Sequence, residues 1–162
     1  MNPRRLWLIR HGEAVSEEFD PERPLTPAGR IQVEAVARVL ARLDVRPAAV
    51  FHSNKLRARQ TAELVGGALR PAPPVREAAH LTPNAHPDQW ADRLDRGEED
   101  LVLVGHLPHL VRLVCALAGL PDFPELVRLE PAGAICVSRP APGQRWSVEW
   151  ILPPAVAGTL TG

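Results

Sequence analysis

The tetrapeptide Arg10-His11-Gly12-Glu13 holds residue types that bind and transfer anionic groups. It directly follows the apolar run 6–9, which has the length of a buried strand. An arginine offers a planar fork of donors to a phosphate or carboxylate, and a glycine lets the backbone come close to such a ligand. The same four residues would also occur if the histidine had only a structural role in a capped loop. This segment alone therefore does not distinguish an anion-binding site from a structural loop.

Two further apolar runs, 48–51 and 101–104, are also followed by polar residues or glycine. Ser53 comes shortly after the first of these runs, and His106 shortly after the second. Ligands of mostly parallel α/β sheets bind beyond the carboxyl ends of the strands. We therefore expect His11, Ser53 and His106 to lie close together although the chain separates them widely.

Helix-length segments separate the three apolar runs. Thr26 can cap a helix with Pro27 in its first turn, and apolar residues continue along one side of it through Asp44. Further helices are expected over 55–65, ending at Gly66-Gly67, from near Pro87 to Gly97, and from Pro108 to Gly119, and two late strands over 133–138 and 146–152. This alternation predicts an α/β fold, a three-layer sandwich with a mostly parallel central sheet flanked by helices.

The length and the charge balance limit the possible classes of protein. The 162 residues suit one domain, 1–162, and the tail 153–162 has little to pack with, so we expect it to be loosely ordered. The 19 basic residues balance 19 acidic ones, which argues against nucleic-acid and anionic-membrane partners because both require a surplus of positive charge. Lys55 is the one lysine, so the positive charge is otherwise carried by arginine.

The apolar run 6–9 is too short for the core of a signal peptide or a membrane span, so we expect a cytoplasmic protein. Cys115 and Cys136 are interpreted as reduced core residues, with a disulfide as the alternative. His106 and His109 have the i, i+3 spacing of a metal pair, but no third ligand is near in sequence, so we expect no metal.

Four separated segments together resemble the histidine phosphatase (phosphoglycerate-mutase-like) superfamily. The matching pieces, in family order, are Arg10-His11-Gly12-Glu13; Pro24-Leu25-Thr26 with Gly29 and Gln32; Ser53 with Leu56-Arg57-Ala58 and Gln60-Thr61-Ala62; and Val104-Gly105-His106. The longer strings Arg23-Pro24-Leu25-Thr26, Leu81-Thr82-Pro83 and Gly105-His106-Leu107-Pro108 look most like the SixA-type phosphohistidine phosphatases, a short branch without a cap domain.

The resemblance implies a role for each matching residue. His11 would be the nucleophile that forms a phosphohistidine intermediate, with its other ring nitrogen held by the carbonyl of Gly12. Arg10 and Arg57 would clamp the phosphoryl oxygens, and His106 would donate to the same group. Arg23 either lines the rim of the site or is a solvated loop arginine.

The sequence departs from the family at the proton donor. Acid-phosphatase relatives have an aspartate after the second histidine, where Leu107 stands here, and mutase-like relatives have a glutamate near the position of His80. His80 or Glu77 could take that place, and a structural role for His80 is equally open. A substrate whose leaving group is an imidazole needs less protonation than an alkoxide, so the missing glutamate favours a phosphoramidate substrate.

The sequence therefore predicts a phosphatase that forms a covalent intermediate on His11 and needs no cofactor. Its expected partner is a protein that bears a phosphohistidine. Two alternatives stay open: a phosphomonoesterase that acts on a small phosphorylated substrate, and a non-catalytic module that only binds phosphate.

Overall fold

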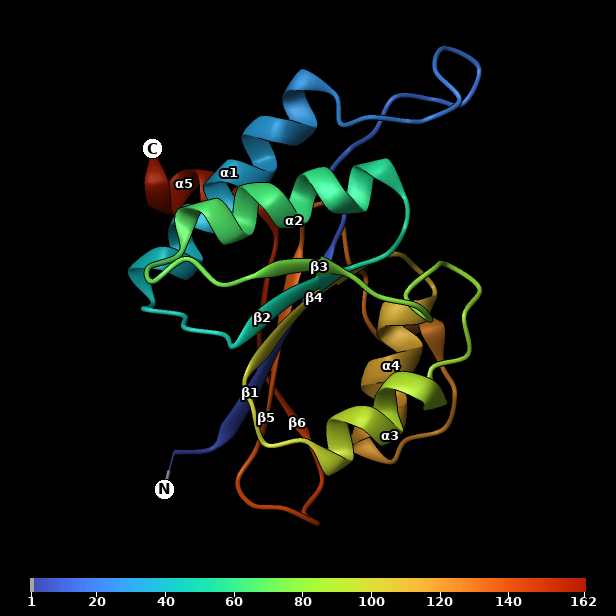
Figure 1. Cartoon of the computed structure of the whole chain (residues 1–162), viewed down its shortest axis with the longest axis vertical. Coiled ribbons are helices and arrows are strands. Elements are labelled where there is room, and N and C mark those ends of the chain that lie inside the picture. The colour runs from blue at the N-terminus through green and yellow to red at the C-terminus, as the bar shows by residue number, and fades with distance from the viewer. Residues whose placement is uncertain (1) are drawn as a thin grey trace.

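The centre of the described chain, residues 2–162 of a computed structural model, is one six-stranded sheet with the order β3-β2-β4-β1-β5-β6 (Figure 1). The parallel strands are β1 (Arg4–Arg10), β2 (Ala49–His52), β3 (Val75–Glu77) and β4 (Leu101–Gly105). β5 (Ala134–Arg139) runs antiparallel to β1, and β6 (Ser147–Leu152) runs antiparallel to β5. The predicted mostly parallel sheet is confirmed.

Helices cover both faces of this sheet. α1 (Pro27–Arg42), α2 (Leu56–Ala68) and α5 (Pro154–Thr161) pack on one face, and α3 (Asp88–Arg96) and α4 (His109–Ala118) pack on the other, with a short 3-10 turn at Pro124–Leu126. Alternate residues of β1 enter the two apolar clusters: Trp7 and Ile9 face the first group of helices, and Leu6 and Leu8 face the second. The three-layer α/β sandwich is confirmed, and no cap domain interrupts it within residues 2–162.

The helix ends follow the predicted signals, with one exception. Thr26 Oγ1 accepts the backbone N–H of Gly29 at 2.9 Å, and α4 ends at Gly119 with φ 67°. The prediction that the second helix stops at Gly66-Gly67 is wrong, because α2 continues to Ala68. Gly66 is buried, and a Cβ at that position would lie 2.6 Å from Val75 Cγ2, so this glycine lets the helix pack closely on β3.

The structure corrects the expectation of a loosely ordered tail over 153–162. Residues 154–161 form α5, in which Pro154 and Ala157 are buried, and Ala157 belongs to the apolar cluster shared with α1. The short strand β3 was not predicted either. None of the described helices is both long enough and apolar enough to cross a bilayer.

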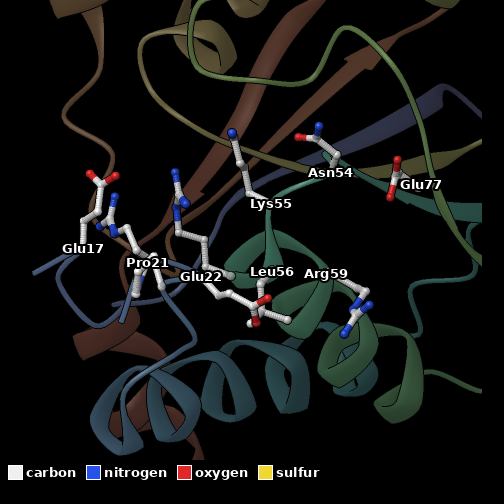
Figure 2. Close-up of a pocket in the computed structure, with 10 residues that line it drawn as sticks. Glu17, Pro21, Glu22, Asn54, Lys55, Leu56, Arg59 and Glu77 are labelled. Carbon is white, nitrogen blue, oxygen red and sulfur yellow. The ribbon is translucent and has the colours of Figure 1, made fainter. Parts of the chain in front are cut away.

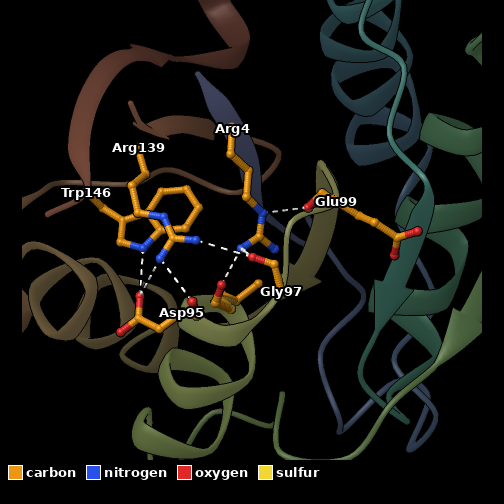
Figure 3. A network of polar contacts seen from close by, with 7 residues as sticks. Arg4, Asp95, Gly97, Glu99, Arg139 and Trp146 are labelled. Carbon is orange, nitrogen blue, oxygen red and sulfur yellow. Dashed lines mark hydrogen bonds and ion pairs between the residues drawn. The ribbon is translucent and has the colours of Figure 1, made fainter. Parts of the chain in front are cut away.

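Two buried arginines fix the end of the sheet opposite the carboxyl ends of the parallel strands (Figure 3). Arg4 and Arg139 pair across β1 and β5, and both donate to the carbonyl of Gly97, at 2.7 and 3.2 Å. Their guanidinium carbons lie 5.3 and 4.9 Å from the ring of Trp146, which itself donates to Asp95 Oδ1 at 2.9 Å. These contacts satisfy the carbonyl groups at the C-terminus of α3 and fasten that helix to the sheet.

Candidate active site

Three adjacent parallel strands deliver the predicted site residues to one edge of the sheet. His11 follows β1, His106 follows β4, and Ser53 follows β2. The rings of His11 and His106 lie 4.9 Å apart between centroids, and Ser53 Oγ lies 2.6 Å from His106 Nε2. The prediction that these three residues lie close together is confirmed.

The hydrogen bond of His11 determines which of its nitrogens can react. Nδ1 lies 2.7 Å from the carbonyl oxygen of Gly12, and because a carbonyl only accepts, Nδ1 carries the proton. Nε2 therefore keeps its lone pair. Gly12 is itself held in place, since its N–H donates to Thr61 Oγ1 at 3.0 Å and the Thr61 hydroxyl donates to the carbonyl of Arg57 at 2.8 Å.

Burial and nearby cations keep His11 neutral. Burial is the largest cause that lowers the pKa of His11 to about 4, the positive charges of Arg57, Arg10 and Arg23 lower it further, and the bond to Gly12 opposes them. The side chain is only 8 % exposed. At neutral pH the ring is therefore an uncharged base.

His106 is also neutral, and Ser53 selects its tautomer. Burial, followed by His11 and Arg57, lowers the pKa of His106 to about 3. Ser53 Oγ accepts the N–H of Lys55 at 3.3 Å, and His106 Nε2 is the one acceptor within reach of its hydroxyl proton among residues 2–162. We assign the Ser53 hydroxyl as the donor to Nε2, which puts the His106 proton on Nδ1, an atom with no partner of its own in the described chain.

Two arginines beside these histidines, the half-buried Arg10 and the buried Arg57, have no carboxylate partner in the described part of the chain. Arg57 is 9 % exposed, and Nε of both Arg10 and Arg57 is buried without a hydrogen bond among residues 2–162. Arg10 is oriented by the carbonyl of Leu129, 2.8 Å from its terminal nitrogen. Burial lowers the pKa of both groups, which remain charged. This cluster of cations suits a small dianion such as a phosphoryl group.

A cleft of about 500 Å³ opens to solvent beside Arg57 (Figure 2), and His11, His106 and Arg10 are not among the residues that line it. Arg57 and Arg23 line it, and Arg23 Nε donates to the carbonyl of Val15 at 3.1 Å. Glu17 and Glu22 lie on one side and Asn54 and Glu77 on the other, with Lys55 between them in Figure 2. The full lining is Glu17, Pro21, Glu22, Arg23, Asn54, Lys55, Leu56, Arg57, Arg59 and Glu77.

The two predicted proton donors have different places. Glu77 lines the cleft, whereas His80 is exposed, has φ 63° and is not among the lining residues. Glu77 ends β3, which is three strands away from β1, or roughly 14 Å at the usual strand spacing. In an in-line displacement the leaving atom lies on the side of phosphorus opposite His11, so the role of Glu77 as proton donor stays a prediction.

Sequence reasoning missed two supporting residues in the segment that follows Lys55. Thr61 holds Gly12, and Gln60 Oε1 accepts the N–H of Leu25 at 2.8 Å, which ties the loop before α1 to α2. Both belong to the matched string Gln60-Thr61-Ala62. The family match therefore pointed to both residues, but it did not indicate which contacts they make.

Comparisons with known proteins agree with this geometry. Residues 6–82 match the model of the histidine phosphatase superfamily (branch 1). An uncharacterized protein of Picosynechococcus sp. is 36% identical over 121 residues, which cover 70% of this chain and 72% of that protein.

Among solved structures, the protein histidine phosphatase SixA complexed with tungstate superposes with a TM-score of 0.82 at 25% identity, covering 93% of this chain and 97% of that one. The alpha-ribazole phosphatase from Shigella flexneri gives a TM-score of 0.75 at 19% identity, with 93% and 96% coverage, and this likeness concerns the fold alone. The buried histidines and arginines at the edge of the sheet and the sequence match to residues 6–82 lead to the same assignment: the chain belongs to the histidine phosphatase superfamily (branch 1).

Proposed function

We propose that the protein removes the phosphoryl group from a phosphohistidine carried by another protein, with His11 as the nucleophile. Membership of the superfamily and the likeness to SixA support phosphatase activity. The observation that carries the proposal is His11 itself: a neutral ring whose Nδ1 is held by Gly12, leaving Nε2 free beside Arg10 and Arg57.

The reaction has two displacements. Nε2 of His11 attacks phosphorus, a new P–N bond forms, and the bond from phosphorus to the substrate imidazole breaks. The second nitrogen of that ring has taken a proton from solvent beforehand, so the ring leaves with the electron pair as neutral imidazole. Water then attacks the phosphoryl group on His11, gives up a proton and releases inorganic phosphate, which restores the neutral ring. Arg10 and Arg57 bind the phosphoryl oxygens, and N–H of His106 at Nδ1 donates to the same group.

Three further residues singled out in the sequence act around this centre in the proposal. Gly12 keeps His11 in its reactive tautomer, Ser53 orients His106, and Arg23, which lines the cleft, adds positive charge near His11. The proposal requires neither His80, which is exposed, nor Glu77, which lines the cleft, as a proton donor. An imidazole leaving group suits such a site, because its ring nitrogen leaves without the strong protonation that an alkoxide requires.

The test is a comparison of substrates with one variant. The wild-type protein and His11→Ala are incubated with a histidine-phosphorylated protein, phosphoimidazole, and a panel of sugar and nucleotide phosphates. We expect phosphate release from the phosphohistidine protein by the wild type only, and transient label from a ³²P-phosphorylated substrate on His11.

Each other outcome contradicts part of the proposal. If His11→Ala released phosphate as fast as the wild type, His11 would not be the nucleophile. Phosphate binding without covalent label would make the protein a phosphate-binding module. Sugar or nucleotide phosphates that react faster by orders of magnitude would make it a small-molecule phosphomonoesterase.

We further propose a cytoplasmic location. The supporting observation is that Cys115, in α4, and Cys136, in the apolar cluster on the opposite face of the sheet, are both free and buried, which suits a reducing compartment. Exposure of the thiols to a labelling reagent only after unfolding, without prior reduction, tests their state in protein purified from cells.

A further inference from the structure

The loop between β1 and α1 contains a hydrogen-bonded segment, residues 15–24, which we call the 15–24 projection. An isolated bridge between Ala14 and Leu25 closes its base, and Val15 N–H donates to the carbonyl of Pro24 at 2.8 Å. Asp20 N–H donates to the carbonyl of Ser16 at 3.1 Å. Figure 1 shows the segment as a blue loop that stands out from the helices. These bonds give the projection a defined shape, as in a compact surface loop.

Phe19 lies in the outer turn of this projection and is 87 % exposed, more than any other large apolar residue in the described chain. Single exposed apolar residues are common on protein surfaces. Phe19 differs from such a residue in its position, because Glu17, Pro21 and Glu22 of the same projection form one wall of the active-site cleft. A large aromatic side chain beside a site is a typical anchor for a protein partner.

The projection also carries a charge opposite to that of the inner cleft. Glu17, Glu18, Asp20 and Glu22 are carboxylates, and none of them forms an ion pair among residues 2–162. Arg57 lines the same cleft, is buried, and has an Nε without a hydrogen-bond partner among residues 2–162. The phosphoryl group is therefore drawn to the arginines, while the outer wall favours cationic groups next to it.

We propose that the 15–24 projection docks the protein that carries the phosphohistidine, with Phe19 packing into an apolar hollow of that protein and Glu18 and Asp20 pairing with its lysines or arginines. The partner surface is thus basic and apolar around its phosphohistidine. A small phosphorylated molecule that reaches Arg57 gains nothing from Phe19. This inference rests on the proposed function.

The test uses three substrates: phosphoimidazole, a peptide whose phosphohistidine is flanked by lysines and leucines, and the same peptide with glutamates in place of the lysines. Wild-type protein is compared with Phe19→Ser, Glu18→Lys and Phe123→Ser. Phe123 is the matched control, because it is also an exposed phenylalanine, 53 % exposed, and lies outside the cleft.

We expect the wild type to cleave the lysine peptide with a kcat/KM about tenfold above that for the glutamate peptide. Phe19→Ser and Glu18→Lys lose most of this preference by a higher KM, while Phe123→Ser keeps it and all variants cleave phosphoimidazole at the wild-type rate.

Equal cleavage of the two peptides by wild type, or a preference that survives in both projection variants, overturns the docking proposal and leaves the proposed function intact. Slower cleavage of phosphoimidazole by Phe19→Ser also overturns it, because the residue would then act on the reaction itself. Failure to cleave any of the three substrates overturns docking and function together.

Discussion

His11 and His106 show what residue identity predicts about this site and what it leaves open. The family motif predicted that the Gly12 carbonyl holds the His11 ring, and the 2.7 Å contact confirms it. That Ser53 holds His106 was not predicted, because the two residues lie on different strands and residue types do not say which ring nitrogen meets which hydroxyl. The contact between His11 and its neighbour Gly12 could therefore be predicted from the sequence. The contact between Ser53 and His106 on different strands could be found only from the three-dimensional structure.

The low pKa of His11 predicts an unusual acid limit. The nucleophile must be neutral, so activity falls only as the pH drops towards about 4, rather than through the ordinary histidine value of 6.5. NMR titration of the imidazole signals in the free protein measures this directly. The variant Arg57→Gln removes a nearby positive charge, so the titration midpoint of His11 should rise. A midpoint near 6.5 in the wild type would contradict the burial argument.

Replacing Ser53 with alanine frees the His106 ring to change tautomer. We expect Ser53→Ala to lower kcat by about tenfold or more, with a smaller change in KM, because His106 donates best in the transition state. Imidazole ¹⁵N shifts should show the Nδ1–H form in the wild type and a mixture in the variant. Ser53→Thr, which keeps the hydroxyl, should retain the wild-type shifts. If the His106 tautomer were unchanged in Ser53→Ala, Ser53 would not be the residue that positions the His106 ring.

The helices and strands were predictable where a regular apolar pattern and an end signal coincide. α1 begins after Thr26, and α4 ends at Gly119, as the signals indicated. β3 was not predicted because it has only three residues and none of them is fully buried, so the sequence shows no apolar run there. The Gly66-Gly67 pair was misread as a stop, because a sequence does not distinguish a glycine that ends a helix from one that lets it pack closely.

The two adjacent glycines of α2 form a matched pair for testing this. A Cβ at Gly67 meets no atom within 4 Å, so Gly67→Ala should raise the free energy of unfolding by about 0.5–1 kcal/mol through its helix propensity. The same change at Gly66 places a methyl group against Val75, so Gly66→Ala should give no gain or a loss. Urea unfolding measures both, and equal gains would refute the close approach of α2 and β3.

At the scale of the whole molecule, the position of the site followed from a general property of α/β sheets, while the outer shape of the cleft did not. The carboxyl ends of β1, β4 and β2 meet at one edge, and the pattern of apolar runs followed by polar residues predicts from the sequence that His11, His106 and Ser53 lie there together. The cleft wall comes from irregular loops such as residues 15–24, whose conformation depends on individual hydrogen bonds rather than on periodicity.

A buried histidine outside the proposed chemistry links the stability of the whole fold to pH. His109 is 0 % exposed and has no hydrogen bond from either ring nitrogen among residues 2–162. Burial, followed by the charge of His80, lowers its pKa to about 4. In the unfolded chain His109 binds a proton near pH 6.5, whereas in the folded chain it stays neutral down to about pH 4. Stability is therefore lost as the pH falls from 6.5 towards 4.

The variant His109→Leu tests this contribution. We expect the free energy of unfolding at pH 7 to be unchanged or higher, because an unpartnered polar ring is replaced by an apolar side chain of similar size. The loss of stability between pH 7 and 4 should shrink by on the order of 1–3 kcal/mol. Thermal or urea unfolding across this pH range supplies the measurement. A pH dependence identical to that of the wild type would show that His109 does not take part.

The central position of β1 also has a consequence for biosynthesis. β1, which directly precedes the nucleophile, lies between β4 and β5, so both of its neighbours are translated long after it, and the second is complete only at residue 139. Such non-local pairing is slow to form and cannot start from the N-terminal half alone. On the ribosome the nucleophile is thus made early but assembled late, so nascent chains that end before β5 should be unable to transfer a phosphoryl group.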